Sequence, residues 1–418
     1  MLGFDTYDSI IAASVVLILS FYFGLVSKKT NIPSVLLLIV LGIMLKFGLD
    51  NVTDRVIDFL PLLSTLGTVG LIMIVLEAAL ELELKSEKLI PIAKSFAIAL
   101  IGLFASMYAA ALILHYFIPG MNMSNALLYA TPLSILSSAI IIPSVTELRE
   151  DKKEFHIYES TFSDIIGIIV FFYLQGSLQE GSHQGIGGYS LSILITIVAS
   201  VIVSYILILV FQNIKSHTKL FLLLATLLLL YALGKKLHLS SLIIILIFGL
   251  MISNMRLFFR GPLKNLLQYK AARHIYEGLH VVTMETAFVV RTFFFVIFGL
   301  TISLASLFNL QVAIISLLII ISIYLIRFIM LRILIGGDIL PQLFIAPRGL
   351  ITVLLFYSIP EGLVPGFDKG ILLFIIIATC LIMTAAMIYD KHRSGLAIKK
   401  ATDNPVGYEK WKAPTLEG

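Results

Sequence analysis

Residues 155–174 read FHIYESTFSDIIGIIVFFYL, a mostly apolar stretch that contains two carboxylates, Glu159 and Asp164. About 20 such residues suffice for an α-helix to cross the hydrocarbon layer of a bilayer. Ionisable side chains are costly inside that layer, so those that occur there are candidates for function. The stretch therefore predicts a membrane-spanning helix that carries a functional group.

Similar apolar runs recur along the whole chain. Of its 418 residues, 59% are hydrophobic and 13% are charged, whereas about 25% of the residues in a soluble domain are charged. We expect an all-α polytopic membrane protein, with one transmembrane domain over 1–390 and a flexible cytoplasmic tail over 391–418. The thirteen expected spans are 8–27, 32–48, 61–82, 92–117, 124–146, 157–178, 190–212, 219–234, 239–254, 283–304, 311–333, 343–359 and 369–390.

The basic residues indicate how the spans are oriented. If the N-terminus faces outward, 22 of the 30 Lys and Arg residues lie in inward loops or in the tail, as the positive-inside rule requires. We therefore expect a bacterial inner (plasma) membrane protein with its N-terminus outside and its C-terminus cytoplasmic. The longest inward loop, 255–282, reads as a basic amphipathic segment on the membrane surface. Charge spread over short loops predicts lipid, not nucleic acid, as the partner.

Asp164 is the strongest candidate for a functional group. The residues that follow it, 165–168, are Ile, Ile, Gly and Ile. An apolar setting disfavours the charged carboxylate, so the group can hold either a proton or a small cation. Hard cations prefer oxygen ligands, and the hydroxyls of Ser160 and Ser163 flank the carboxylate. Ser160 lies four residues before Asp164, on the same helical face. These residues predict a site at which a proton and a cation compete.

The fifth span supplies a second half of the site. Residues 124–146 contain Pro132 and Pro143 together with the hydroxyls of Thr131 and Ser134. Proline inside a helix removes a hydrogen-bond donor and frees a carbonyl group. Such backbone persists at membrane depth only where protein or a water-filled cavity receives it. We therefore expect an interrupted helix whose carbonyls and hydroxyls face the ion.

The twelfth span, 343–359, has a similar interruption around Arg348. Two interrupted segments at corresponding positions of two halves indicate an inverted repeat with the ion site between them. The expected halves are 8–178 and 219–390, and the span 190–212 links them.

Other ionisable residues have structural interpretations. Glu159 is five residues before Asp164 and therefore about 140° away around the helix, so we expect it to form an ion pair with Arg291. Arginine is always protonated and needs such a partner inside a membrane. Glu81 and Arg327 lie near span ends, where we expect them at the membrane interface.

Enzyme chemistry finds no support in the sequence. The single cysteine, Cys380, lies within a span, which excludes disulfides and thiolate metal sites. We find no phosphate-binding loop, nucleophile elbow or His/Cys ligand cluster. Neither a cofactor nor an enzymatic activity is expected.

The segment Glu159–Asp164, ESTFSD, resembles the E-S-x-x-N-D motif of the monovalent cation/proton antiporter superfamily, in its sodium/proton exchanger (NhaP/NHE-like) branch. Arg291 matches the arginine that pairs with the motif's glutamate, and Arg348–Gly349 resembles an R-G late in the chain. Ile32–Pro33 and Leu76–Glu77 also fit, so the resemblance covers essentially the whole chain.

The resemblance implies a homodimer with a dimerisation domain beside a mobile core domain, and alternating access of the elevator type. It implies that Asp164 carries the cation or proton, with Ser160 and Thr131 as further oxygen ligands. Two departures stand out: Ser163 replaces the Asn or Asp of the motif, and Pro132 stands where a T-D-P pattern would place Asp. The first favours electroneutral one-for-one exchange. The second leaves the choice between Na⁺ (with Li⁺) and K⁺ open.

Two other classes of function stay open. An ion channel or an organic-anion transporter could use Arg291 and Arg348 as cationic groups that face the cavity. An intramembrane enzyme would need paired acids, a zinc motif or a Ser/His arrangement, and the sequence contains none of them.

Overall fold

The computed structural model describes residues 6–30, 32–52, 60–82, 84, 88–146, 148–178, 186–214, 219–236, 241–261, 266–301, 309–360, 362–365 and 367–403. Within these residues the chain is almost wholly α-helical and contains no strand. Eight of the described helices are long and apolar enough to cross a membrane. The expected all-α polytopic membrane protein is confirmed, and each expected span coincides with a helix or an interrupted helix.

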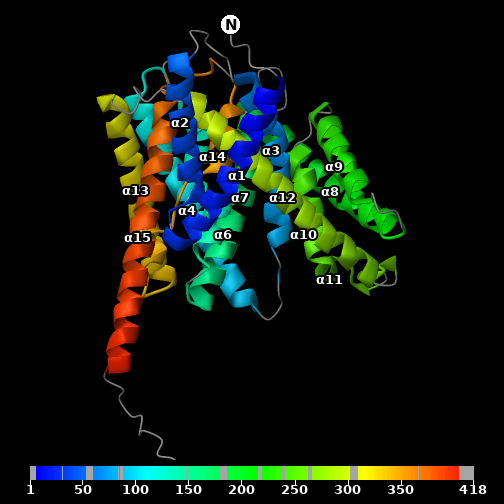
Figure 1. Ribbon diagram of the computed structural model, residues 1–418. Coiled ribbons are helices and arrows are strands. Elements are labelled where there is room, and N and C mark those ends of the chain that lie inside the picture. Colours follow the sequence, from blue (N-terminus) through cyan, green and yellow to red (C-terminus); the bar gives the residue numbers. More distant parts are fainter. Residues whose placement is uncertain are drawn as a thin grey trace, which may run out of the picture.

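The helices form two sets, judged by which of them pack on one another (Figure 1). We call the first set the panel. It comprises α1 (Thr6–Thr30), α2 (Ser34–Val52), α3 (Leu60–Glu81), α8 (Ile186–Phe211), α9 (Lys219–Lys236), α10 (Ser241–Ser253), α11 (Met255–Phe258) and α12 (Tyr269–Thr301). In this set α12 packs along α2 and α3, and α10 packs on α3, α8 and α9.

We call the second set the core bundle. It comprises α4 (Leu89–Phe117), α5 (Met123–Ser134), α6 (Ser138–Ser144), α7 (Glu150–Leu178), α13 (Leu310–Leu334), the 3₁₀ turn η4 (Gln342–Phe344), α14 (Leu350–Tyr357) and α15 (Gly370–Asp403). Here α4 packs on α5, α7 and α13, and α13 packs on α15. In Figure 1, α13 and α15 lie at the left edge and α8 and α9 at the right edge. The seam between the sets is formed mainly by α3 against α7 and α14, by α7 against α8, and by α1 against α6.

Close backbone contact holds the panel together. A Cβ atom at Gly42 would overlap the backbone of α12, and one at Gly299 would overlap the backbone of α2. Small residues permit this approach between membrane helices, where packing replaces the hydrophobic effect as the driving force. A hydrogen bond of 2.6 Å between the hydroxyls of Ser20 and Thr292 joins α1 to α12.

Both expected interruptions are present in the core bundle. The fifth span divides into α5 and α6 at residues 135–137, and the twelfth is extended over 345–349 before α14 begins. Pro132 and Pro143 lie inside α5 and α6, so neither stands in the break itself.

Two expected boundaries are wrong. The loop expected over 255–282 is partly helical, because α12 already begins at Tyr269. Ala272, Ile275, Tyr276 and Leu279 are buried at helical spacing, so the packed face of α12 continues through this segment. The tail expected from residue 391 begins as a continuation of α15 to Asp403, and its remainder lies outside the described residues.

Candidate functional site

The break between α5 and α6 exposes three consecutive backbone N–H groups, which tertiary contacts satisfy. Leu136 N donates to Ser163 Oγ (3.0 Å) and Ser138 N to Asp164 Oδ2 (3.2 Å). Ser137 N donates to the carbonyl of Pro347 (3.0 Å) in the other interrupted span. Buried N–H groups need partners, so these acceptors explain why the helix can stop at this depth. The two interrupted spans therefore cross beside α7.

The crossing also requires a glycine. A Cβ atom at Gly349 would overlap the side chain of Ser137 and crowd Ile140. Any larger residue at position 349 would push the two interrupted spans apart. The close approach of the spans therefore explains why a glycine follows Arg348.

Asp164 is completely buried on α7, at the start of α6. Its Oδ2 accepts the Ser138 N–H, while its Oδ1 has no hydrogen-bond partner among the described residues. A buried carboxylate oxygen without a donor is costly, and a proton or a cation would remove that cost. The geometry therefore leaves one coordination position open on the residue that the sequence singled out.

Three buried hydroxyls on α5 and α7 donate to the preceding turn of their own helix. Ser160 Oγ donates to His156 O (2.7 Å), Thr131 Oγ1 to Leu127 O (2.7 Å) and Ser134 Oγ to Ala130 O (2.9 Å). All three side chains are buried. Because each hydrogen is engaged with the preceding helical turn, the oxygen lone pairs stay available to a cation.

Ser163 has a structural role at the break, beside its expected place near the ion. Its hydroxyl oxygen accepts the Leu136 N–H at the break, so it positions the backbone there. Its place beside Asp164 follows from the sequence, but the task of holding the break could only be seen in the fold.

Arg348 lies at the C-terminal end of α5 and is 2% exposed. Its Nε donates to Leu133 O (2.8 Å), a carbonyl that the break leaves without a helical partner. Its backbone N–H donates to Thr379 Oγ1 on α15 (3.1 Å). Arg348 thus compensates the partial negative charge of a helix end and ties the crossing to α15.

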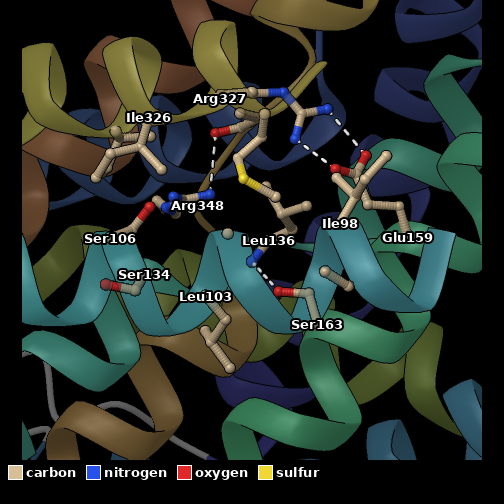
Figure 2. A pocket seen from close by; sticks show the side chains of 15 residues that line it. Ile98, Leu103, Ser106, Ser134, Leu136, Glu159, Ser163, Ile326, Arg327 and Arg348 are labelled. Carbon is tan, nitrogen blue, oxygen red and sulfur yellow. Dashed lines mark hydrogen bonds and ion pairs between the residues drawn. The ribbon is translucent and has the colours of Figure 1, made fainter. Parts of the chain in front are cut away.

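Glu159 does not pair with Arg291, contrary to the sequence-based expectation. It forms a bidentate ion pair with Arg327 of α13, with distances of 2.6 and 2.9 Å. Arg327 also donates to the carbonyl of Gln342, and its side chain is 8% exposed. Its expected place at the membrane interface is therefore wrong. Arg327 points inward across the core bundle, because α7 places Glu159 opposite α13 (Figure 2).

Arg291 instead pairs with Glu77, at 2.8 and 3.1 Å, and joins α12 to α3 within the panel. One helical turn later, Glu81 ends α3. Glu81 was expected only at the membrane interface. Glu81 is four residues after Glu77, and this spacing indicates that both carboxylates lie on the same face of α3.

A cavity adjoins the break on the side of α4 and α13 (Figure 2). Its polar lining consists of Ser106, Ser134, Ser163, the Glu159–Arg327 pair and Arg348. Within the described part of the chain, no group of three His, Cys, Asp or Glu side chains could hold a metal. Asp164, whose second carboxylate oxygen is open, does not line this cavity.

The family described as "Sodium/hydrogen exchanger, transmembrane" matches residues 14–388. The chain belongs to the sodium/hydrogen exchanger family. Its members are transporters and not enzymes, which confirms that no enzymatic activity is to be expected. No match was found among curated proteins.

Solved structures agree with this assignment. The sodium proton antiporter MjNhaP1 from Methanocaldococcus jannaschii at pH 8 has a TM-score of 0.67 and 19% identity, covering 91% of this chain and 98% of that one. An electron-microscopy structure of the same antiporter has a TM-score of 0.67 and 18% identity, covering 98% and 100%. At this identity the likeness shows a shared fold. The resemblance drawn from ESTFSD is confirmed at the level of the family.

Proposed function

We propose that this exchanger moves one monovalent cation against one proton by competition at Asp164. The carrying observation is the buried Asp164 carboxylate, with one oxygen fixed by Ser138 N and the other left without a donor among the described residues. A proton and a cation would each complete that oxygen, and neither can do so while the other is bound. Ser160 and Thr131 would offer further oxygen lone pairs.

A single carboxylate supports one-for-one, electroneutral exchange. Ser163, which precedes Asp164, has no ionisable group, and its hydroxyl oxygen accepts the Leu136 N–H at the break. One site charge neutralised by either one proton or one monovalent cation leaves no net charge to move in the cycle. Na⁺ is the proposed cation, with Li⁺ as a further substrate and K⁺ as the alternative.

The two helix sets support an elevator motion. The ion site lies wholly in the core bundle, and contacts across the seam are sparse beside those within each set. Sliding of the core bundle past the panel would expose Asp164 to each side in turn. We propose that the panel also forms the homodimer contact.

Proton movement in proteoliposomes tests the proposal. Pulses of Na⁺, Li⁺ and K⁺ are added outside acid-loaded vesicles that contain wild type or Asp164→Asn. We expect cation-driven alkalinisation of the interior in wild type and at least a 100-fold lower rate in the variant. The responding cation decides between Na⁺ and K⁺, and an unchanged rate on collapsing the membrane potential supports electroneutrality.

Glu277→Gln is the matched control, because Glu277 is an exposed carboxylate paired with Arg273 on the surface. It should exchange at the wild-type rate. Full exchange by Asp164→Asn would refute the assignment of the site, and folded wild type that responds to no cation would refute exchange itself. Binding of organic anions is disfavoured at Arg291, because Glu77 already neutralises it.

A further inference from the structure

The cavity between α4, α5, α7 and α13 contains a positive charge that the transport mechanism does not use. Glu159 and Arg327 neutralise each other there. Arg348 lines the same cavity and is 98% buried. Asp164 is not among the residues that line it. The net charge of the side chains around the cavity is therefore positive.

No carboxylate of the described residues pairs with Arg348. The helix it caps, α5, reads MSNALLYATPLS and contains no acidic residue. The α5 C-terminus contributes roughly half an elementary negative charge, which offsets only part of the guanidinium. An arginine buried without a counter-charge is far more costly than a paired one. Something with negative charge would complete this environment.

Several hydrogen-bond donors around the cavity have no acceptor among the described residues. Arg348 uses Nε on Leu133 O (2.8 Å) and Nη1 on Ala346 O (3.4 Å), while Nη2 has no acceptor among the described residues. The Ser163 oxygen accepts from Leu136 N, so its own hydrogen can turn into the cavity. Ser106 lies beside Arg348 in Figure 2 and is 5% exposed. Unused N–H and O–H groups around a positive charge fit an anion and not a cation.

We propose that this cavity binds a small monovalent anion of the halide type, held by Arg348 with the hydroxyls of Ser106 and Ser163. The small volume of the cavity, about 30 Å³, and its mostly apolar lining disfavour larger oxyanions. The anion stays in place as a counter-ion and is not transported. It stabilises the crossing of the interrupted spans, because Arg348 links α5 to α15 there.

Thermal stability under exchange of anions tests the proposal. Detergent-purified protein is melted at constant Na⁺ and ionic strength while gluconate is replaced stepwise by chloride or bromide. We expect the melting temperature of wild type to rise by a few degrees and to saturate, as specific binding to the native state requires. In proteoliposomes, replacing chloride by gluconate on both sides should lower the cation exchange rate several-fold.

Ser106→Asp places a carboxylate beside Arg348. It should abolish the halide dependence of both the melting temperature and the cation exchange rate. Ser106→Asn matches the Asp variant in shape but carries no charge, and it should weaken the halide effect without abolishing it. A wild-type melting temperature that is insensitive to halide, or that rises without saturation, would mean that the cavity holds water only. Undiminished halide dependence in Ser106→Asp would place the anion elsewhere.

If Ser106→Asp fails to fold, bromide located by its anomalous scattering in wild-type crystals decides the question. A bromide peak beside Arg348 supports the proposal, and its absence at saturating bromide overturns it. The melting temperature and the bromide peak are both measured without any cation exchange, so failure of this proposal can be distinguished from failure of the proposed transport function.

Discussion

The panel and the core bundle bury different kinds of surface. In the panel, α2 and α12 approach until Gly42 and Gly299 are in backbone contact, and close packing sets the geometry of that helix pair. In the core bundle, the chain breaks twice, and charged or hydroxyl side chains satisfy the exposed backbone. Polar bonds are strong where water is excluded, and costly when one partner is missing. The core bundle should therefore respond more sharply than the panel to the loss of single polar atoms.

The largest effect on stability is expected from Glu159→Gln in the core bundle. The substitution leaves the guanidinium of Arg327 buried without its carboxylate, and breaking a buried pair in this way costs about 3–5 kcal/mol. We expect a marked fall in the melting temperature of the purified protein, measured by scanning fluorimetry. A fall no greater than that of the exposed-site variant Glu277→Gln would contradict this picture of the core bundle.

An intermediate effect is expected from Gly299→Ala in the panel. The added methyl group would overlap the backbone of α2 at Ile39 and Gly42, and overpacking costs about 1–3 kcal/mol. The matched control is Gly24→Ala on α1, where a Cβ atom meets nothing within 4 Å. If Gly299→Ala proves more destabilising than Glu159→Gln in the same melting assay, the contrast between the two sets fails.

The smallest effect is expected from Asp338→Asn at the surface of the core bundle. Asp338 pairs with Lys152 at 2.8 Å, but 69% of its side chain is exposed. Pairs of this kind contribute about 0–1 kcal/mol and weaken with salt. The variant should melt within a degree or two of wild type, and any difference should shrink in high salt. A large, salt-independent loss would show that this surface matters to the bundle more than its exposure indicates.

Hydropathy was sufficient to locate the helices, because lipid requires each span to satisfy its own backbone. It failed at α12, where the helix extends past the bilayer-length segment and its packed face is amphipathic. The interruption near residues 135–137 followed from the prolines, yet the structure places both prolines within helices. The break depends on acceptors from α7 and residue 347, which are distant in sequence.

The candidate site could be predicted only where it depends on residues close together in the sequence. Helical spacing assigned Asp164 and Ser160 to one face of α7, because that relation is local. The ion-pair partner of Glu159 lies on another helix, and residue spacing within one helix cannot identify which helix that is. Arg327 carried a usable signal, since the residues on both sides of it are apolar, but its distance from the span end was short enough to suggest the interface.

The three N–H groups of the break have acceptors only from the core bundle, namely Ser163, Pro347 and Asp164. In the proposed mechanism, the ion site would therefore be assembled within the core bundle, while α3 and the rest of the panel would form the surface along which it slides. Choice of ion and speed of turnover would then be encoded in different residues. Substitutions along the face of α3 would change how fast the proposed exchange runs, without altering which ion is accepted.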